Sequence, residues 1–186
     1  MKTGATVEFT RIVVLSILAA VGYGICHDQV TVRVCLEYFT IGHAPVFNTT
    51  SPTLLAIGWG VIASWWMGAF LGIPLAAASR IGSRPKLTAS DLLKPIGILL
   101  AVMAGSAFLA GVAGSAAAAS GRICLTGPMK TRVPLDRHQA FLTDLCAHNA
   151  AYAVGFVGGF VLCGYAVHVR KRRELTASEH WAQHVP

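Results

Sequence analysis

Charged residues are scarce in this chain, since Asp, Glu, Lys and Arg together make up 12% of its 186 residues. Soluble proteins typically carry about 25%, so the composition excludes an ordinary soluble domain. Apolar residues make up 54% of the chain, and the mean hydropathy is +0.60. Because the apolar residues are gathered in long runs, they indicate helices that span a membrane.

Several functional motifs are also missing. The sequence has no P-loop, GxSxG, nucleotide-binding fingerprint or haem-attachment motif. Its five cysteines form no CxxC pair, which argues against zinc-ribbon and thioredoxin-type centres. The net charge of +7 does not indicate nucleic-acid binding, because the basic residues lie at the ends of apolar runs and form no recognition motif. The expected partner is therefore the lipid bilayer, and not a nucleic acid.

Four apolar runs predict an all-α membrane protein, a four-transmembrane-helix bundle forming one domain over residues 1–186. The expected spans are residues 9–26, 53–78, 95–119 and 149–169. The first run also has features of a signal peptide, but no convincing cleavage site follows it, so a retained helix is favoured. Thr88 and Asp91 have the spacing of a capping box ahead of the third span.

The distribution of basic residues predicts the orientation of the bundle. Cytoplasmic segments are enriched in Lys and Arg. One side holds ten of them: Lys2, Arg11, Arg80, Arg84, Lys86, Lys94, Arg170, Lys171, Arg172 and Arg173. The other side holds five: Arg33, Arg122, Lys130, Arg132 and Arg137. Both chain ends and the tail 170–186 are therefore expected on the cytoplasmic side of the membrane, and segments 27–52 and 120–148 are expected on the outer face.

Small residues mark expected packing faces on the helices. Gly68 and Gly72 form one GxxxG motif, and Gly155 and Gly159 form another. Helices in lipid associate through such close approaches. Packing within one bundle is the favoured interpretation, and a homo-oligomer or a membrane-protein partner is the alternative.

The segment after the first span alternates valine and leucine with polar residues between Val30 and Glu37. Period two with β-branching predicts a short extended segment at 28–40 that forms part of an ordered cap on the outer face. A helical continuation, with Arg33 and Glu37 paired at i, i+4, is the alternative. The string HDQVTVRVCLEYFTIGHAPVF, of the form HDQxTxRxxxEYFTxGH, resembles the signature of small uncharacterised bacterial integral membrane proteins. The resemblance runs through GWG at 58–60 to the glycine-rich fourth span. It implies a multi-pass protein of a bacterial inner membrane, but no activity.

Polar side chains gather in the two outer segments. A mixed histidine and carboxylate site suits zinc, iron or manganese, and ionisable groups close to a membrane often have a function. The candidate metal ligands are His27, Asp28, Glu37, His43, Asp144 and His148. The candidate supporting residues are Arg33, Tyr38, His138 and Tyr152. On a helix, Asp144, His148 and Tyr152 form one stripe. A buried polar network without metal, or plain solvated polarity, explains the same residues.

The cysteines and the function leave further alternatives. An oxidising outer compartment permits disulfides among Cys26, Cys35, Cys124 and Cys146. The favoured function is that of a structural or accessory membrane component. The alternative is a metal-dependent or redox membrane enzyme that uses the outer histidine and carboxylate cluster with a divalent transition metal. A transporter is disfavoured because the spans carry almost no ionisable residue near their middle.

Overall fold

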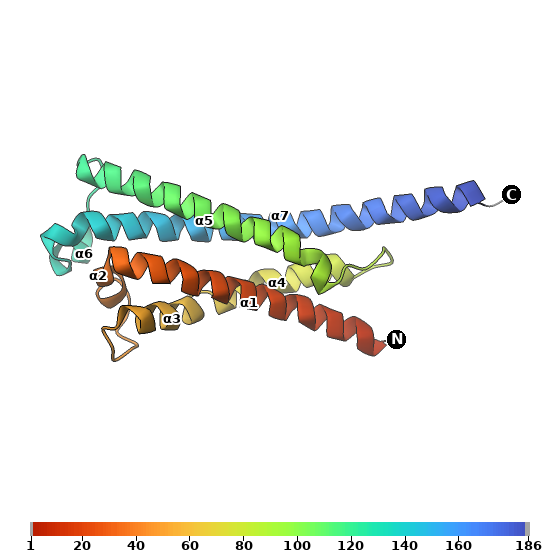
Figure 1. Ribbon diagram of the computed structural model, residues 1–186, viewed down its shortest axis with the longest axis horizontal. Helices are drawn as coiled ribbons and strands as arrows, with labels where there is room; N and C mark the ends of the chain where they lie inside the picture. Colours follow the sequence, from red (N-terminus) through yellow and green to blue (C-terminus); the bar gives the residue numbers. More distant parts are fainter. Residues whose placement is uncertain (1, 185–186) are drawn as a thin grey trace.

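The chain forms an elongated bundle of helices, seen in a computed structural model that describes residues 2–184 (Figure 1). The elements are α1 (Lys2–Val34), α2 (Leu36–Thr40), α3 (Pro52–Ile62), α4 (Trp65–Arg80), α5 (Ala89–Ala119), α6 (Gly127–Arg132), a 3-10 turn η1 (Leu135–Arg137) and α7 (His138–His184). Four stretches are long and apolar enough to cross a membrane: Thr6–Val34, Pro52–Arg80, Ala89–Ala119 and Leu135–Glu179. The all-helical fold with four such stretches agrees with the sequence.

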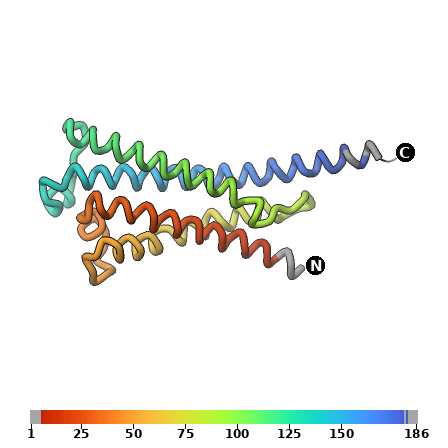
Figure 2. Tube along the Cα trace, in the orientation of Figure 1, coloured from red at the N-terminus to blue at the C-terminus, as the bar shows by residue number. Residues whose placement is uncertain are grey.

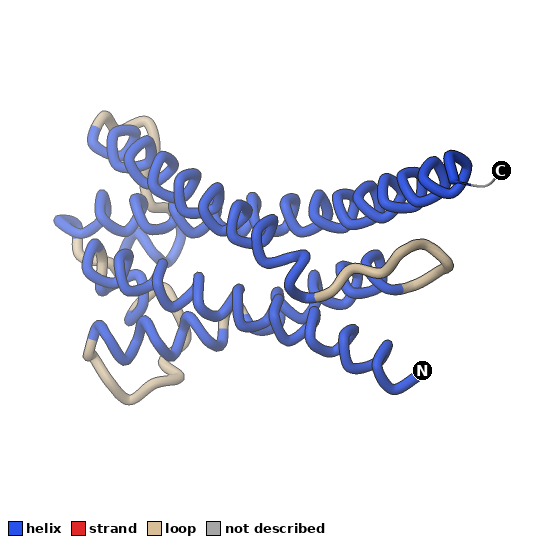
Figure 3. Tube along the Cα trace, turned by 45° about the vertical axis from the view of Figure 1, so that its right-hand side comes forward, coloured by secondary structure: helices blue, strands red, loops and turns tan. Residues whose placement is uncertain are grey.

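The bundle consists of two helical pairs. α1 packs along α3 and α4, α5 packs along α7, and α4 joins the pairs by its contact with α7. Figure 2 shows both ends of the chain and the α4–α5 loop at one end of the bundle, while α2 and α6 lie at the other. We call the latter the α2–α6 end. Figure 3 shows the loops that connect the helices at the two ends of the bundle.

The segment 28–34 is helical, so the extended segment expected at 28–40 is wrong, and residues 2–184 contain no strand (Figure 3). α1 continues to Val34, and α2 follows after Cys35. The buried residues are Asp28, Thr31, Val32 and Cys35. Their spacing of i, i+3, i+4 and i+7 is that of one helix face. Val30 and Val34 lie between these buried residues and point outward, with Val30 66% exposed. The alternation of apolar and polar residues in the sequence therefore comes from exposed valines on a helix, and not from a strand.

The second span is interrupted in the structure. α3 ends at Ile62 and α4 begins at Trp65. The Ser64 hydroxyl donates a hydrogen bond to Gly60 O, four residues earlier, and the Tyr152 hydroxyl donates to Ala63 O at 3.3 Å. A hydrogen bond from outside the helix therefore satisfies a carbonyl at the break, and the break lies beside α7.

The capping box predicted at Thr88 and Asp91 is confirmed, and it opens α5 at Ala89. Asp91 also accepts a hydrogen bond from Arg173 Nη2 at 2.7 Å. The cap therefore ties the start of α5 to the basic stretch of α7.

Arg170 on α7 fastens the end of α4 to the loop that follows it. The side chain is buried, and its guanidinium donates only to backbone carbonyls. Those acceptors are Ala78 O, Ile81 O (2.8 Å), Arg84 O (3.2 Å) and Pro85 O (2.9 Å). The last carbonyls of a helix lack intrahelical partners, so Arg170 acts as a C-terminal cap from a neighbouring helix.

Both GxxxG motifs pack inside the bundle. A Cβ on Gly68 would lie 2.7 Å from Ile17 Cα and 2.8 Å from Ser16 O of α1. A Cβ on Gly155 would lie 2.9 Å from Met103 Cε of α5. The glycines thus allow helix contacts that a larger residue prevents, as the interpretation of packing within one bundle expected.

Gly68→Ala is expected to destabilise the bundle by about 1–3 kcal/mol, the usual cost of overpacking, because the added methyl group meets backbone atoms of α1. The measurement is the midpoint of SDS-induced unfolding in mixed micelles. Gly97→Ala is the matched control, because nothing lies within 4 Å of its Cβ position. The control is expected to be neutral or slightly stabilising, since alanine favours helix by up to about 1 kcal/mol. Equal midpoints for both variants would contradict the packing of Gly68 on α1.

Candidate metal centre

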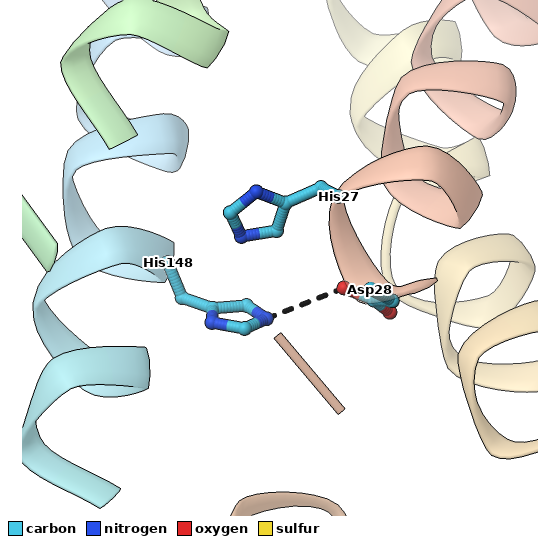
Figure 4. A group of neighbouring side chains, drawn as sticks. All are labelled: His27, Asp28 and His148. Carbon is cyan, nitrogen blue, oxygen red and sulfur yellow. Dashed lines mark hydrogen bonds and ion pairs between the residues drawn. The ribbon is translucent and has the colours of Figure 1, made fainter. Parts of the chain in front are cut away.

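Three of the expected metal ligands come together between α1 and α7, and they are all shown in Figure 4. His27 and Asp28 are consecutive residues of α1, and His148 lies opposite them on α7. One ligand atom from each residue lies within 4.8 Å of the other two. His148 Nε2 is 3.3 Å from Asp28 Oδ1. Asp28 is 5% exposed and His148 is 7% exposed, so the group is enclosed by protein.

The hydrogen bond on the far side of His148 sets its tautomer. His148 Nδ1 lies 2.8 Å from the backbone O of Asp144, one turn earlier on α7. A carbonyl oxygen only accepts, so Nδ1 carries the proton and donates it. The neutral ring then has a lone pair on Nε2, and this lone pair faces Asp28. An ionised carboxylate also only accepts, so a cation, either a proton or a metal ion, must lie between His148 and Asp28.

The distance between the two groups favours the metal ion. Charge-assisted N–H···O bonds are usually about 2.7–2.9 Å long, whereas His148 Nε2 and Asp28 Oδ1 are separated by 3.3 Å. Two ligands bound at about 2.05 Å to a tetrahedral zinc ion lie about 3.3 Å apart. Histidine ligands of metals commonly donate their other N–H to a backbone carbonyl, as His148 does.

His27 completes the group with a free nitrogen. Its ring stacks on Tyr23 at a centroid distance of 5.7 Å and meets the His148 ring edge-on at 4.5 Å. His27 Nε2 is buried and has no hydrogen-bond partner. An unpaired buried polar atom costs about 1–3 kcal/mol, and coordination of a cation by the ring removes that cost.

Aromatic side chains of α2 cover this group at the α2–α6 end. Tyr38 stacks on the His148 ring at 4.5 Å, and Phe39 approaches the same ring edge-on at 5.9 Å. Burial raises the pKa of Tyr38, and the neighbouring Asp144 raises it further. Tyr38 therefore stays a neutral phenol that separates the group from the loops beyond α2.

His43 lies in this aromatic cover and not in the three-residue group. Its Nδ1 is 2.8 Å from Tyr38 O, and its ring lies 4.5 Å from the Trp59 ring. Burial lowers the pKa of His43, and the opposing hydrogen bond to the Tyr38 carbonyl does not offset that effect. His43 is therefore held neutral as part of the wall.

Glu37 is engaged elsewhere. It accepts a hydrogen bond from Arg137 Nε at 3.0 Å and from the Cys35 thiol at 3.4 Å. Burial acts to raise the pKa of Glu37, but hydrogen bonds from its own backbone N–H and from Arg137 bring it below its usual value. Burial also raises the pKa of Cys35, to about 11. Glu37 thus fastens α2 to η1, and the alternative pairing of Glu37 with Arg33 is wrong.

Asp144 is buried one turn before His148 on α7. Its side chain is 1% exposed, and neither carboxylate oxygen has a hydrogen bond. Asp144 and His148 share a buried face of α7, as the predicted stripe requires. Asp144 lies outside the set of ligand atoms that converge within 4.8 Å.

Two of the four expected supporting residues, Arg33 and His138, have contacts elsewhere. Arg33 Nη1 donates to Gln29 Oε1 at 2.7 Å, and Arg33 Nη2 donates to Thr53 Oγ1 at 3.2 Å. His138 Nε2 lies 3.0 Å from Val133 O. Tyr152 contacts the break at Ala63 and lines the cavity beside the histidines. Only Tyr38 and Tyr152 of these four therefore border the site.

The cysteines are free thiols in the structure. Cys26 and Cys124 are exposed, Cys35 is buried and Cys146 is half-buried. The structure therefore forms none of the disulfides that the sequence permits among these residues.

Tyr23 and the break at residues 63–64 were not predicted from the sequence. Tyr23 lies four residues before His27, and residues at i, i+4 share a helix face, so the spacing contained a usable signal. The break follows Gly60 and includes Ser64, and Gly/Ser pairs are among the usual causes of kinks in helices. Length and hydropathy alone do not reveal either feature.

A cavity of about 70 Å³ opens from the three-residue group into the bundle. His27, Asp28 and His148 line it together with Met67 and Met103. An ion held by these three side chains has open space on one side.

Comparison with known proteins gives no family for this chain, since no family model, curated protein or solved structure matches it.

Proposed function

We propose that this chain is a multi-pass membrane protein that binds one divalent transition-metal ion through His27, Asp28 and His148. Zinc fits the ligand set best, and iron and manganese accept the same donors. Three protein ligands leave a coordination position free, as in catalytic zinc sites. The bound metal would act as a Lewis acid on a ligand oxygen at that position.

Exposed apolar side chains support the membrane location. Leu18, Phe108 and Leu109 are each more than 60% exposed on the bundle surface. A lipid environment removes the cost of such exposure. The excess of Lys and Arg at the end with both chain termini supports a cytoplasmic location for that end, in the inner membrane of a bacterium. The metal site would then lie near the outer face, beneath a cap that includes α2.

One observation carries the metal proposal: His148 Nδ1 donates to Asp144 O, while His148 Nε2 faces Asp28 Oδ1 at 3.3 Å. The Nε2 lone pair of His148 and the carboxylate of Asp28 are both acceptors, and they face each other in the protein interior. The third residue of the group, His27, has an unpaired Nε2. A metal ion satisfies all three groups at once. The resemblance of segment 27–43 to small bacterial membrane proteins is consistent with this proposal but adds no activity to it.

An accessory membrane component without metal is the second candidate. A proton shared by His148 and Asp28 also satisfies their acceptors, and stacking of Tyr38 on His148 stabilises the same arrangement. This candidate leaves His27 Nε2 without a partner, which is why we place it second.

Elemental analysis of the detergent-purified protein distinguishes the two. We expect about one zinc, iron or manganese ion per chain after purification without chelators. Removal of the ion should lower the thermal midpoint, because a ligand present at 100 times its Kd stabilises a protein by about 2.7 kcal/mol. Re-addition should restore the midpoint.

His138→Ala is the matched control, because His138 contacts Val133 O and lies outside the site. The control should retain the full metal content. Metal at background level, together with no change in midpoint on adding zinc, iron(II) or manganese(II), would support the accessory component instead.

A further inference from the structure

A second cavity lies next to the one beside the three-residue group. It has a volume of about 80 Å³ and shares Ala20, Met67, Met103 and Gly155 with the first. Beyond these residues it reaches Leu99 and Leu162. Apart from the three-residue group and a few hydroxyl groups, the lining of both cavities is apolar. We call the two adjacent cavities together the bundle channel.

The bundle channel is suited to an apolar chain rather than to water. A cavity of about 10–15 Å³ on this measure admits one water molecule, but apolar cavities much larger than this stay dry and bind apolar ligands. Glycines of α3, α4 and α7 border it, at places where a side chain would meet a neighbouring helix. Its apolar lining fits a hydrocarbon chain.

A ligand reaches the proposed metal site through the cavity between the long helices, and not through the α2–α6 end. Tyr38 and Phe39 cover His148 at the α2–α6 end. Tyr152 lines the channel and is 40% exposed on the bundle surface, next to the break at Ala63 that its hydroxyl contacts. In a membrane this surface faces lipid, so a ligand that enters here comes from the bilayer.

From these observations we infer that the bundle channel binds a single-chain amphiphile with a carboxylate head, a fatty acid, whose head occupies the free position on the metal and whose chain lies along Met67 and Met103. The inference rests on the proposed metal site. A carboxylate is an oxygen donor that zinc accepts, and its charge offsets the excess positive charge of a divalent ion that has one acidic protein ligand, Asp28.

The test uses the full-length protein loaded with cobalt(II), whose absorption spectrum changes when an oxygen ligand enters its coordination shell. Dodecanoate is titrated into the protein in detergent, and acetate provides the same head without the chain. We expect dodecanoate to change the spectrum at a concentration at least tenfold lower than acetate. Each buried methylene contributes about 0.8 kcal/mol, which is roughly fourfold in affinity, so even a partly buried chain gives this difference.

Variants separate the channel from partitioning into micelles. Met103→Trp fills the channel at one of the residues that both cavities share, and it should raise the half-saturating dodecanoate concentration at least tenfold. Ala20→Phe narrows the same section from α1 and gives a second reading if Met103→Trp does not fold. Leu109→Trp is the matched control, since Leu109 is 67% exposed on the outer face of α5, and it should behave as the unmodified protein does.

The outcomes distinguish the two proposals. If cobalt binds and dodecanoate acts no better than acetate, or acts equally on Met103→Trp and Leu109→Trp, the fatty-acid inference is wrong and the metal site stands. If neither cobalt nor zinc binds, both proposals fail.

Discussion

His148→Ala is expected to weaken metal binding about 100-fold or more, since even residues that only support a metal ligand cost 10–100-fold when they are replaced. The alanine removes the Nε2 donor that lies 3.3 Å from Asp28 Oδ1. The measurement is zinc affinity by competition with a chromogenic chelator, on protein that remains monodisperse in detergent.

His43→Gln is the matched control for this experiment. His43 lies in the aromatic wall, where its Nδ1 contacts Tyr38 O, and glutamine keeps a group capable of that hydrogen bond. Zinc affinity should change by no more than about threefold, in contrast to the loss of a ligand. Equal losses in His43→Gln and His148→Ala would show that the metal is bound nearer the loops, with the ligand set that the sequence alone suggested.

Asp28→Asn tests whether Asp28 is a metal ligand or only supports the fold, because the two roles predict different effects on stability and on zinc affinity. The asparagine amide can donate to the His148 Nε2 lone pair, so the metal-free protein should keep or gain stability. Zinc affinity should fall because the anionic ligand is lost. A variant that loses stability and metal together would indicate that Asp28 acts mainly through the fold.

Arg170→Met is expected to lower the free energy of unfolding by about 3 kcal/mol or more, because hydrogen bonds to charged groups contribute about 1.5–3 kcal/mol each. The substitution keeps an apolar side chain of similar length but leaves the carbonyls of Ala78, Ile81, Arg84 and Pro85 without their donor. The change is measured as the midpoint of SDS-induced unfolding.

Arg172→Met is the control for charge, since Arg172 is exposed and lies in the same basic run. It should leave the midpoint nearly unchanged. Arg170→Lys should lie between the two, because an ammonium group keeps the charge but lacks the planar fork that reaches several acceptors. If Arg172→Met lowers the midpoint as much as Arg170→Met does, the loss of stability comes from the lower positive charge at this end. That result would contradict the role of Arg170 as a cap.

Apolar runs predicted the four long helices because hydropathy is a property of a whole segment and tolerates errors at single residues. Their ends were harder to predict. α1 runs on to Val34 and α7 begins at His138 and runs on to His184, because polar residues at both ends of α7 and at the end of α1 continue the helix. Hydropathy detects the apolar part of a helix and does not show whether the helix continues into the polar residues beside it.

The candidate site was predicted in part. The sequence pointed to two polar segments, and the structure brings His27, Asp28 and His148 together from them. Glu37 and His43 were indistinguishable from these by residue type and by segment. What separates them is the turn at Cys35, which starts a new helix and directs Glu37 toward Arg137. The direction of α2 depends on a contact with Arg137, 100 residues away in the sequence, and no local pattern encodes it.

Arg170 shows the same limit at the other end of the molecule. Its place in the run of four basic residues indicated a membrane anchor, and three of the four fit that description by being exposed. Arg170 alone is buried, because its position on α7 faces the end of α4. The helical phase of α7 relative to α4 decides this, and composition carries no information about that phase.

The uninterrupted course of α7 joins the two ends of the molecule mechanically. His148 and Arg170 are 22 residues apart on one helix, a distance of about 33 Å along its axis. The helix has no proline or break between them to absorb a displacement. If a metal ion binds beside His148 as proposed, a shift of α7 by a fraction of an ångström on binding would move Arg170 against the carbonyls of the α4–α5 loop. The loop at the end of the bundle that holds both chain termini would then respond to the occupancy of a site near the α2–α6 end.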